Sequence, residues 1–484
     1  MELNDNFIYR SDSKGQYDTN LNILKPGNVF PSNEVRGRNR VYRYCKKLYS
    51  GEYAKNKKII ALVNNKETEI PYRVLSMNQF KLIVNKMFSL MFQNEISIKT
   101  GDVERDKTVV SLAERTNWFN SIGRAIKMVE TCGDAFLKTY INGVSPVSPL
   151  NCFKVVHPSD INTTLAFVLY EYLTNEEETK YTHMRVEIHT KGFIYEKVFH
   201  YSGDGKSGVL GESVDYEYRG RLISKDWTIT ETDIEDACCI QHLGVDIEAD
   251  GVYGSSPLLD IQNIVFMLEA RVSSEYHVIA NHENPLLIMG QEMFMPDEKT
   301  GGYKLREVNG KFIVKNAGDN SSPEYVTWDG KLDNSSELRE DLMDYLYELS
   351  EMCKPFMTGE YTGNISEETL NNTIKSAIDK ANRHVTEMWS AIRESLYVLC
   401  RLNDIDVSIQ EINIEFNIGR TDDDKVVSEI AETYIKNNIF SIGTILEKYH
   451  GYTSAQAKAE IEKIIAEKRL LNGLEKEEES YETD

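Results

Sequence analysis

The chain has 484 residues, with 77 Asp or Glu against 55 Lys or Arg, so its formal net charge at pH 7 is −22. Hydrophobic residues make up 41% and charged residues 27%, which is typical of a folded globular protein of roughly two to four domains. A chain this acidic repels a duplex on average, which argues against a protein that holds DNA tightly through its phosphates.

Several function classes have no sequence support. No apolar run approaches the ~18 residues that a membrane helix needs, and the amino terminus lacks the order of a signal peptide, so we expect no membrane partner. Seven scattered cysteines, an odd number, give neither a disulfide framework nor a CxxC pair, and we expect a reducing cytoplasm during assembly. P-loop, GxGxxG and GxSxG motifs are absent, which weighs against a motor ATPase. We expect no cofactor and no metal.

The first feature along the chain is a basic stretch that follows a polar arm over residues 1–35. Its six basic side chains are Arg36, Arg38, Arg40, Arg43, Lys46 and Lys47, interleaved with tyrosines. Basic residues among aromatic ones can bind nucleic acid. They can equally contact an acidic neighbouring subunit or a capsid, and the sequence leaves these alternatives open.

The rest of the amino-terminal half mixes both element types. Helical periodicity predicts helices over Ser76–Phe92 and Val109–Thr131. Alternating β-rich runs then predict strands at Ala135–Ile141, Phe153–Val156, Leu165–Tyr172, Met184–Ile188 and Phe193–Tyr201. Because the strands follow the helices as a group, we predict an α+β fold and not a doubly wound sheet. The Gly-, Ser- and Asp-rich segment Ser202–Asp215 is predicted to be a mobile surface loop.

Two amphipathic helices enclose a short strand-rich insert in the middle of the chain. The first follows Gly254-Ser255-Ser256-Pro257, where Ser256 is predicted to cap it and Pro257 suits the first helical position, and it runs to about His282. The second is predicted over Ser335–Cys353, with Asn334 as its cap and Pro355 as its end. Its apolar stripe consists of Leu338, Leu342, Tyr345, Leu346 and Leu349. Between the helices, strands are predicted at 285–290, 311–314 and 324–328.

A third, longer helix follows a glycine-containing loop. The segment Phe356–Ile365 has no helical period, and Ser366 is predicted to cap a helix whose stripe runs from Leu370 to Leu399. Further helices are predicted at Asp424–Asn437, Ile442–Tyr449 and Ser454–Leu471 before an acidic tail that we expect to be disordered.

This order of elements resembles the portal proteins of tailed bacteriophages, in particular the group typified by the Bacillus phage SPP1 portal. The resemblance covers about Arg43 to Leu470 and includes Gly254-Ser255-Ser256-Pro257-Leu258, Arg43–Tyr53, Lys57–Val63 and Thr131-Cys132-Gly133-Asp134-Ala135-Phe136. One departure lies before the long helix, where many relatives have a serine- and glycine-rich run. This chain has Thr358-Gly359-Glu360-Tyr361-Thr362-Gly363-Asn364 in that place.

The resemblance implies a portal fold with an α/β wing, a two-helix stem, a small β-rich clip, a long wing helix and an α-helical crown. The implied parts are an arm at 1–35, wing at 36–253, first stem helix at 254–282, clip at 283–333, second stem helix at 334–354, tunnel loop at 355–366, long wing helix and strand at 367–420, crown at 421–473 and tail at 474–484.

The same resemblance implies a non-enzymatic ring of twelve subunits at one capsid vertex of the virion, assembled in the host cytoplasm. The channel would pass double-stranded DNA during packaging and ejection, and the implied partners are the terminase large subunit, a head-tail adaptor, the major capsid protein and a scaffold. The tunnel loop would comprise Met357, Thr358, Gly359, Glu360, Tyr361, Thr362, Gly363 and Asn364. Tunnel-lining candidates are Glu337, Glu340, Asp341, Asp344, Glu348 and Glu351.

Each of these readings has a plainer alternative. The carboxylates of the second helix can be an ordinary solvated helix face. Cys238-Cys239 fits buried thiols. Asp422-Asp423-Asp424 fits a helix cap better than a metal site, because adjacent residues rarely converge on one ion. For the whole chain, the alternatives are another virion structural protein, such as a minor capsid or adaptor component, or a metal-dependent enzyme that processes nucleic acid.

Overall fold

The structure is a computed structural model, and the chain divides into two compact units. Unit 1 comprises Met1–Lys46, Ile83–Pro257 and Pro355–Asp484, and unit 2 comprises Lys47–Leu82 and Leu258–Lys354. The residues that the structure describes are 24–54, 58–63, 66–71, 75–92, 96–157, 159–174, 181–282, 286–290, 294–296, 303–305, 312–315, 324–326, 333–359, 374–418, 435–436, 441–449 and 457–466.

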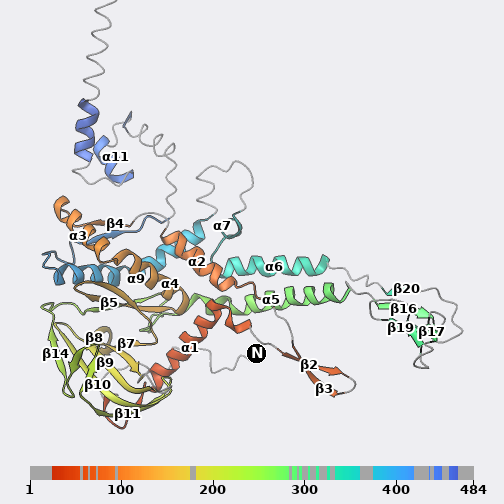
Figure 1. The fold of residues 1–484 in the computed structure, drawn as a ribbon. Coiled ribbons are helices and arrows are strands. Elements are labelled where there is room, and N and C mark those ends of the chain that lie inside the picture. The colour runs from red at the N-terminus through yellow and green to blue at the C-terminus, as the bar shows by residue number, and fades with distance from the viewer. Residues whose placement is uncertain are drawn as a thin grey trace, which may run out of the picture. The chain divides into compact units, whose positions relative to one another are not determined.

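The largest element of unit 1 is a seven-stranded sheet (Figure 1). Along its path the strands are β1 (Val29–Phe30), β11 (Gly208–Ser213), β10 (Phe193–Gly203), β9 (Tyr181–His189), β8 (Asp160–Leu173) and β7 (Cys152–His157), and β14 (Thr228–Glu231) also pairs with β10. Every pairing in this sheet is antiparallel, which agrees with the predicted α+β class and excludes a doubly wound sheet here.

The predicted strands from Phe153 to Tyr201 are confirmed as β7 to β10, each somewhat longer than predicted. The predicted loop Ser202–Asp215 is wrong in part, because Gly208–Ser213 forms β11 and Val209 pairs with Ser202 of β10. Tight approach explains the glycines of this hairpin: a Cβ on Gly208 would lie 2.4 Å from the Tyr201 ring. Glycines that suggest a loop in the sequence therefore serve close strand packing.

Alternation along the strands places one core cluster on one face of the sheet, while Cys152, Val156 and Phe167 belong to a second cluster. Val168, Met184 and Val186 belong to one cluster of buried side chains with Phe30 and Phe199. Because side chains alternate between the two faces of a strand, intervening residues such as Arg185 and Glu187 lie on the opposite face.

A second, three-stranded sheet of unit 1 carries helices. Its order is β15 (Ile240–Gly244), β5 (Asp134–Tyr140) and β6 (Gly143–Val147), and α4 (Trp118–Cys132) and α9 (Lys375–Leu402) pack against it (Figure 1). The single helix predicted over Val109–Thr131 is wrong, because α3 (Val103–Arg115) and α4 are separate. Asn117 between them has a φ of 57°, a left-handed conformation that Asn tolerates and that interrupts a helix.

The remaining elements of unit 1 are small. They are β4 (Ser97–Lys99) paired with β21 (Asn413–Glu415), β12 (Tyr216–Tyr218) paired with β13 (Arg221–Ile223), and α11 (Ile442–Tyr449), with a helical segment at 457–466. Helices α1 (Asn33–Ser50), α2 (Gln79–Met91) and α7 (Lys354–Thr358) each contain a boundary between the units. The helix predicted at Ile442–Tyr449 is confirmed, whereas Asp422–Asp424 and most of Asp424–Asn437 lie outside the described residues.

Unit 2 consists mainly of two long helices, α5 (Pro257–His282) and α6 (Asp333–Leu349). The chain between them forms β16 (Leu286–Gly290), parallel to β19 (Phe312–Lys315) and antiparallel to β20 (Glu324–Val326), and a hairpin of β17 (Phe294–Pro296) with β18 (Tyr303–Leu305). A separate hairpin pairs β2 (Lys58–Val63) with β3 (Lys66–Pro71), and η3 (Glu52–Ala54) precedes it. The first predicted helix is confirmed with its bounds, and so is a strand insert after it.

The end of α6 differs from the prediction. The helix stops at Leu349 because Glu351 has a φ of 57°, and Pro355 instead stands in the first turn of α7. The predicted loop that begins at Phe356 is therefore helical as far as Thr358. The predicted start of the long helix at Ser366 lies outside the described residues, and α9 is described from Lys375. None of the described helices is both long and apolar enough to cross a membrane.

Candidate functional site

Helices α5 and α6 lie side by side in unit 2 and run in opposite directions (Figure 1). Arg339 of α6 forms an ion pair with Glu275 of α5 at 3.4 Å, and Arg271 reaches the same carboxylate at 3.6 Å. Leu342 and Leu346 of α6 are buried. The buried side of α6 is thereby fixed, which leaves the opposite side in solvent.

Five of the six predicted tunnel-lining carboxylates lie on that exposed side. At about 100° per residue, they fall within an arc of roughly 100° on the helix. We call this set the acidic face of α6: Glu337, Glu340, Asp341, Asp344 and Glu348, all exposed. Glu351 is only half-buried and lies beyond the end of the helix.

The acidic face is weakly neutralised. Asp344 forms an exposed ion pair with Lys354 at 3.6 Å, and within the described part of the chain the other four carboxylates have none. Exposed pairs of this kind contribute little to stability. A row of like charges on one helix face is mildly destabilising, so these residues are not explained by the stability of α6 itself.

The predicted apolar stripe of α6 is buried at only two of its five positions. Leu342 and Leu346 are buried, but Leu338, Tyr345 and Leu349 are 45%, 56% and 51% exposed. These three lie together on the flank between the buried side and the acidic face. A five-residue stripe is wider than the contact that one neighbouring helix covers.

A buried carboxylate on α5 holds the chain around the β2–β3 hairpin. Glu269 is 2% exposed and accepts hydrogen bonds from the Tyr53 hydroxyl at 2.7 Å, from Ser76 Oγ at 3.1 Å and from the Met77 amide at 2.9 Å. One turn on, Ser273 Oγ accepts from the Leu75 amide at 2.9 Å. Three donors compensate for the burial of the charge, which would otherwise be costly. In the sequence, the position of Glu269 among the apolar residues Val265, Leu268 and Val272 is the signal that its side chain is buried.

The sequence motifs Thr131–Phe136 and Gly254–Leu258 lie next to each other at the start of α5. The Gly254 amide donates to Asp134 Oδ1 at 2.8 Å, and the hydroxyl of Ser256 donates to the Thr131 carbonyl at 2.7 Å. A Cβ on Gly133, whose φ is +89°, would lie 2.6 Å from the backbone of Ser255. Backbone packs directly on backbone here, so both glycines are required by close approach. Ser256 thus ties the helix start to α4.

Asp134 itself is fully buried and forms several hydrogen bonds. Besides Gly254 it accepts from the Tyr42 hydroxyl at 2.7 Å and contacts the His242 ring at 2.6 Å. Burial is the largest influence on His242 and lowers its pKa to about 4, while burial also lowers the pKa of Lys154, 3.1 Å from the same ring, to about 8. This cluster is a structural connection of α1, β5 and β15.

The basic stretch lies on α1, and the fold divides it. Arg38 is 5% exposed and stacks on the Tyr253 ring at 3.9 Å, Lys46 donates to Ser148 Oγ at 2.9 Å, and Arg36 donates to Ser207 Oγ at 3.0 Å. These three hold unit 1 together. Arg40 and Lys47 are exposed and Arg43 is half-buried, so only they stay available for the predicted contact with DNA or capsid.

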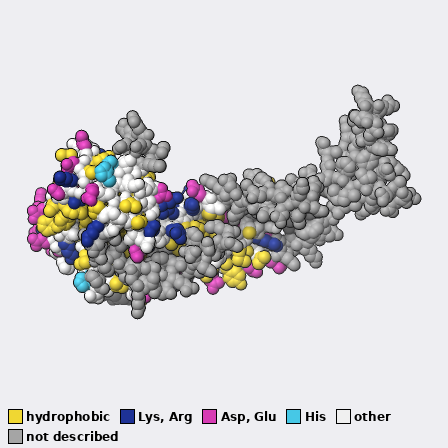
Figure 2. All heavy atoms as spheres, turned by 90° about the horizontal axis from the view of Figure 1, so that it is seen from below, with side chains coloured by type: hydrophobic (Ala, Val, Ile, Leu, Met, Phe, Trp, Pro, Cys, Tyr) yellow, Lys and Arg dark blue, Asp and Glu magenta, His cyan; other side chains and the backbone are white. Residues whose placement is uncertain are grey.

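A continuous basic surface is not seen on the face in Figure 2. There, the described Lys and Arg side chains are interspersed with Asp, Glu and apolar ones. Non-specific duplex binding needs several cations in register with the phosphates. The charge distribution on this face therefore does not favour the hypothesis that the basic stretch binds DNA.

The predicted tunnel loop is described only at its beginning. Met357 is buried, Thr358 and Gly359 are exposed, and Gly359 has a φ of +72°. Lys86 Nζ donates to the Phe356 carbonyl at 2.9 Å, which anchors the start of the loop to α2. Glu360, Tyr361, Thr362, Gly363 and Asn364 lie outside the described residues.

Catalytic or metal-binding chemistry finds no support in the described residues. All seven cysteines are free thiols, and burial raises the pKa of Cys239 to about 11 and that of Cys238 to about 12, so both are inert. Within the part of the chain that was searched, no group of three His, Cys, Asp or Glu side chains could hold a metal ion.

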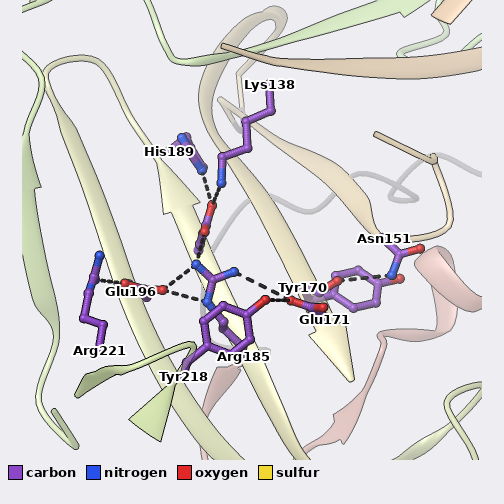
Figure 3. Close-up of polar contacts among 10 residues, drawn as sticks. Lys138, Asn151, Tyr170, Glu171, Arg185, His189, Glu196, Tyr218 and Arg221 are labelled. Carbon is purple, nitrogen blue, oxygen red and sulfur yellow. Dashed lines mark hydrogen bonds and ion pairs between the residues drawn. The ribbon is translucent and has the colours of Figure 1, made fainter. Parts of the chain in front are cut away.

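A dense charged cluster lies on the polar face of the large sheet (Figure 3). Glu187 pairs with Lys138, Arg185 and His189, and Glu196 pairs with Arg185 and Arg221. Burial raises the pKa of Glu187, but its three partners outweigh burial and hold the pKa well below its usual range. Tyr218 of the β12–β13 hairpin stacks on Arg185 at 4.5 Å and donates to Glu171 at 2.7 Å. The carboxylates and the basic groups of the cluster compensate one another's charges. The cluster therefore fixes the β12–β13 hairpin to the sheet.

Comparisons with known proteins relate part of this chain to one family. Residues 36–228 match the family model described as phage portal protein, SPP1 Gp6-like. No curated protein matches the sequence. Similar solved structures include a chain of the virion of a native gene transfer agent particle, at 10% identity and a TM-score of 0.37, covering 74% of this chain and 84% of that chain. Another is a chain from the neck of an empty gene transfer agent particle, at 10% identity and a TM-score of 0.42, covering 76% of this chain and 88% of that chain. Over residues 36–228, this chain is therefore similar to the SPP1 Gp6-like phage portal proteins.

Proposed function

We propose that the protein forms a ring of twelve copies at one capsid vertex and that double-stranded DNA enters and leaves the particle through the ring. The family match supports a portal role. The observation that carries the channel assignment is the acidic face of α6: five exposed carboxylates on one side of a helix whose other side is buried.

The proposed mechanism is electrostatic repulsion at short range. Each copy would turn its acidic face to the lumen, so a duplex that approaches the wall meets carboxylates and not phosphate-binding cations. At physiological ionic strength the Debye length is about 8 Å, so the repulsion acts only near the wall and leaves the centre of the channel almost field-free. The duplex is kept centred and moves without tight contacts.

The partners of this channel are also part of the proposal. A separate ATP-driven terminase would dock near the strands between α5 and α6, and a head-tail adaptor would take its place after packaging. The rest of the ring would contact the major capsid protein and a scaffold. The absence of nucleotide-binding motifs in the sequence supports an external motor.

Charge reversal on the acidic face tests the channel assignment. The variant D341K/D344K should lower the yield of DNA-filled heads about tenfold, because lysines at the wall bind phosphates and retard the duplex. The yield is measured by nuclease-protected DNA per assembled head. D341E/D344E, which keeps the charge, and E212K/E217K, which reverses two exposed charges in unit 1, should both package normally. An unchanged yield for D341K/D344K would show that the acidic face does not line the channel.

A further inference from the structure

Helix α6 exposes an apolar stripe beside its acidic face. The stripe consists of Leu338, Tyr345 and Leu349, each about half exposed. The spacings of seven and four residues align the three side chains along about 16 Å of the helix. Large apolar side chains that line up in this way mark an interaction surface more often than singly scattered ones do.

Helix α5 exposes a face of different chemistry. Met267 is 56% exposed, and Ala270 and Ser274 are exposed on the same side, three and seven residues further along. We call these three residues the outer face of α5. It carries no charge, and two of its side chains are small, so another helix can approach it closely.

Charge decides which partner the apolar stripe accepts. DNA and an anionic lipid surface are repelled by the adjoining carboxylates. A second α6 in symmetric contact would place two acidic faces along the same interface, which is unfavourable. The outer face of α5 brings no charge against the carboxylates and offers apolar surface to the stripe.

We propose that the apolar stripe of α6 docks on the outer face of α5 in a neighbouring copy of this chain. The inference rests on the proposed ring and specifies the contact that closes it. Because the contact joins two different surfaces, it is heterologous, and repetition around an axis generates a ring and not a two-fold dimer. The stripe lies roughly 100° around α6 from the centre of the acidic face, so docking leaves the carboxylates uncovered.

Disulfide cross-linking in assembled rings tests the contact. In a Cys353→Ser background, which removes the half-buried native thiol, Tyr345→Cys is combined in turn with Met267→Cys, Ala270→Cys and Ser274→Cys. The three partners cover seven residues of α5, so the test does not depend on the exact register. We expect at least one pair to give a ladder of covalent oligomers under mild oxidation on a non-reducing gel. The matched control, Glu348→Cys with Ala270→Cys, should stay monomeric.

Each outcome has a definite meaning. If rings of normal size form by electron microscopy and none of the three pairs cross-links, the contact is wrong while the proposed ring survives. Efficient cross-linking of Tyr345→Cys to itself, as dimers only, would overturn the contact in favour of a symmetric one. If the unmodified protein forms no rings, the proposed function itself fails. As a second variant, L338S/Y345S/L349S should leave the monomer folded by circular dichroism, because these side chains are exposed, and should reduce ring formation at least tenfold.

Discussion

At the residue scale, the close approach of Gly133 and Gly254 fixes where α5 starts. A Cβ on Gly254 would lie 2.3 Å from the Gly133 carbonyl oxygen. The Val245 amide donates a hydrogen bond to the same oxygen at 3.1 Å. No side chain fits between the two segments. The quoted Thr131–Phe136 and Gly254–Leu258 motifs therefore have one common physical explanation.

Substitution of Gly133 separates backbone strain from steric overlap. Gly133→Ala should lower the free energy of unfolding by about 3 kcal/mol or more, since a positive φ and a backbone overlap both oppose the methyl group. Gly27→Ala is the matched control, because Gly27 has a similar φ of +87° but nothing within 4 Å of its added Cβ. It should cost only about 1–2 kcal/mol. Urea unfolding followed by tryptophan fluorescence measures the unfolding free energy of both variants. Equal losses of free energy would contradict a steric overlap at Gly133.

His384 of α9 gives a pH-dependent prediction. Its ring is fully buried, 2.7 Å from Glu130 and 3.5 Å from Asp246. Burial by itself lowers the pKa of His384, but the two carboxylates outweigh burial and raise it to about 9. The pKa is higher in the folded than in the unfolded state, so the imidazolium stabilises the fold fully below about pH 6.5, and this stability is lost as the pH rises through about 9.

His384→Gln measures this contribution. The difference in unfolding free energy between the natural protein and the variant should be about 3 kcal/mol larger at pH 6 than at pH 10, as a pKa raised from 6.5 to about 9 requires. Urea titrations at intervals between these pH values give the profile. A difference that does not change with pH would mean that His384 is neutral in the fold.

At the element scale, the buried side of α5 anchors the chain on both sides of the β2–β3 hairpin. Glu269 binds residues 53 and 75–78 on its buried side, and Tyr53 packs edge-on against Phe80 at 5.4 Å. The segments that flank the β2–β3 hairpin are thereby anchored on one helix turn. A short two-stranded hairpin has little stability of its own, so its base depends on this anchor.

Removal of the anchor should free that segment without unfolding the helices. Glu269→Ala leaves three donors without their acceptor, which should cost on the order of 3 kcal/mol locally. Hydrogen exchange of a peptide that covers Leu75–Asn78 should accelerate at least tenfold. Glu275→Ala, which removes the ion pairs with Arg271 and Arg339, serves as control and should leave that peptide unchanged. Equal acceleration in both variants would indicate general loosening of α5 in place of a specific anchor.

At the scale of the whole molecule, the net charge of −22 and the division of the basic stretch lead to one expectation. The purified protein should show no saturable binding of a short DNA duplex at micromolar concentration and about 0.15 M salt, because the overall charge is repulsive and the three available cations of the basic stretch release too few counterions. R40A/R43A/K47A should leave that result unchanged. Fluorescence anisotropy measures both, and tight binding that the triple variant abolishes would instead assign α1 to DNA.

Periodicity in the sequence by itself determined the long helices, several strands and the acidic side of α6. These features depend on residues within a few positions of one another, and the 3.6-residue and two-residue repeats express them directly. Prediction from local sequence was wrong where one residue with a positive φ interrupts a helix, as at Asn117 and Glu351. It was also wrong where a glycine allows close strand packing, as at Gly208.

Only the tertiary structure decided how distant residues are used. Arg38 and Tyr253, or Gly133 and Gly254, are more than a hundred positions apart, and no local pattern marks them as partners. The same is true of Glu269, whose buried role depends on donors near residue 76. Burial and pairing are properties of the packed chain, so the sequence could name the acidic face, whereas the structure showed which basic residues and which apolar side chains remain for partners.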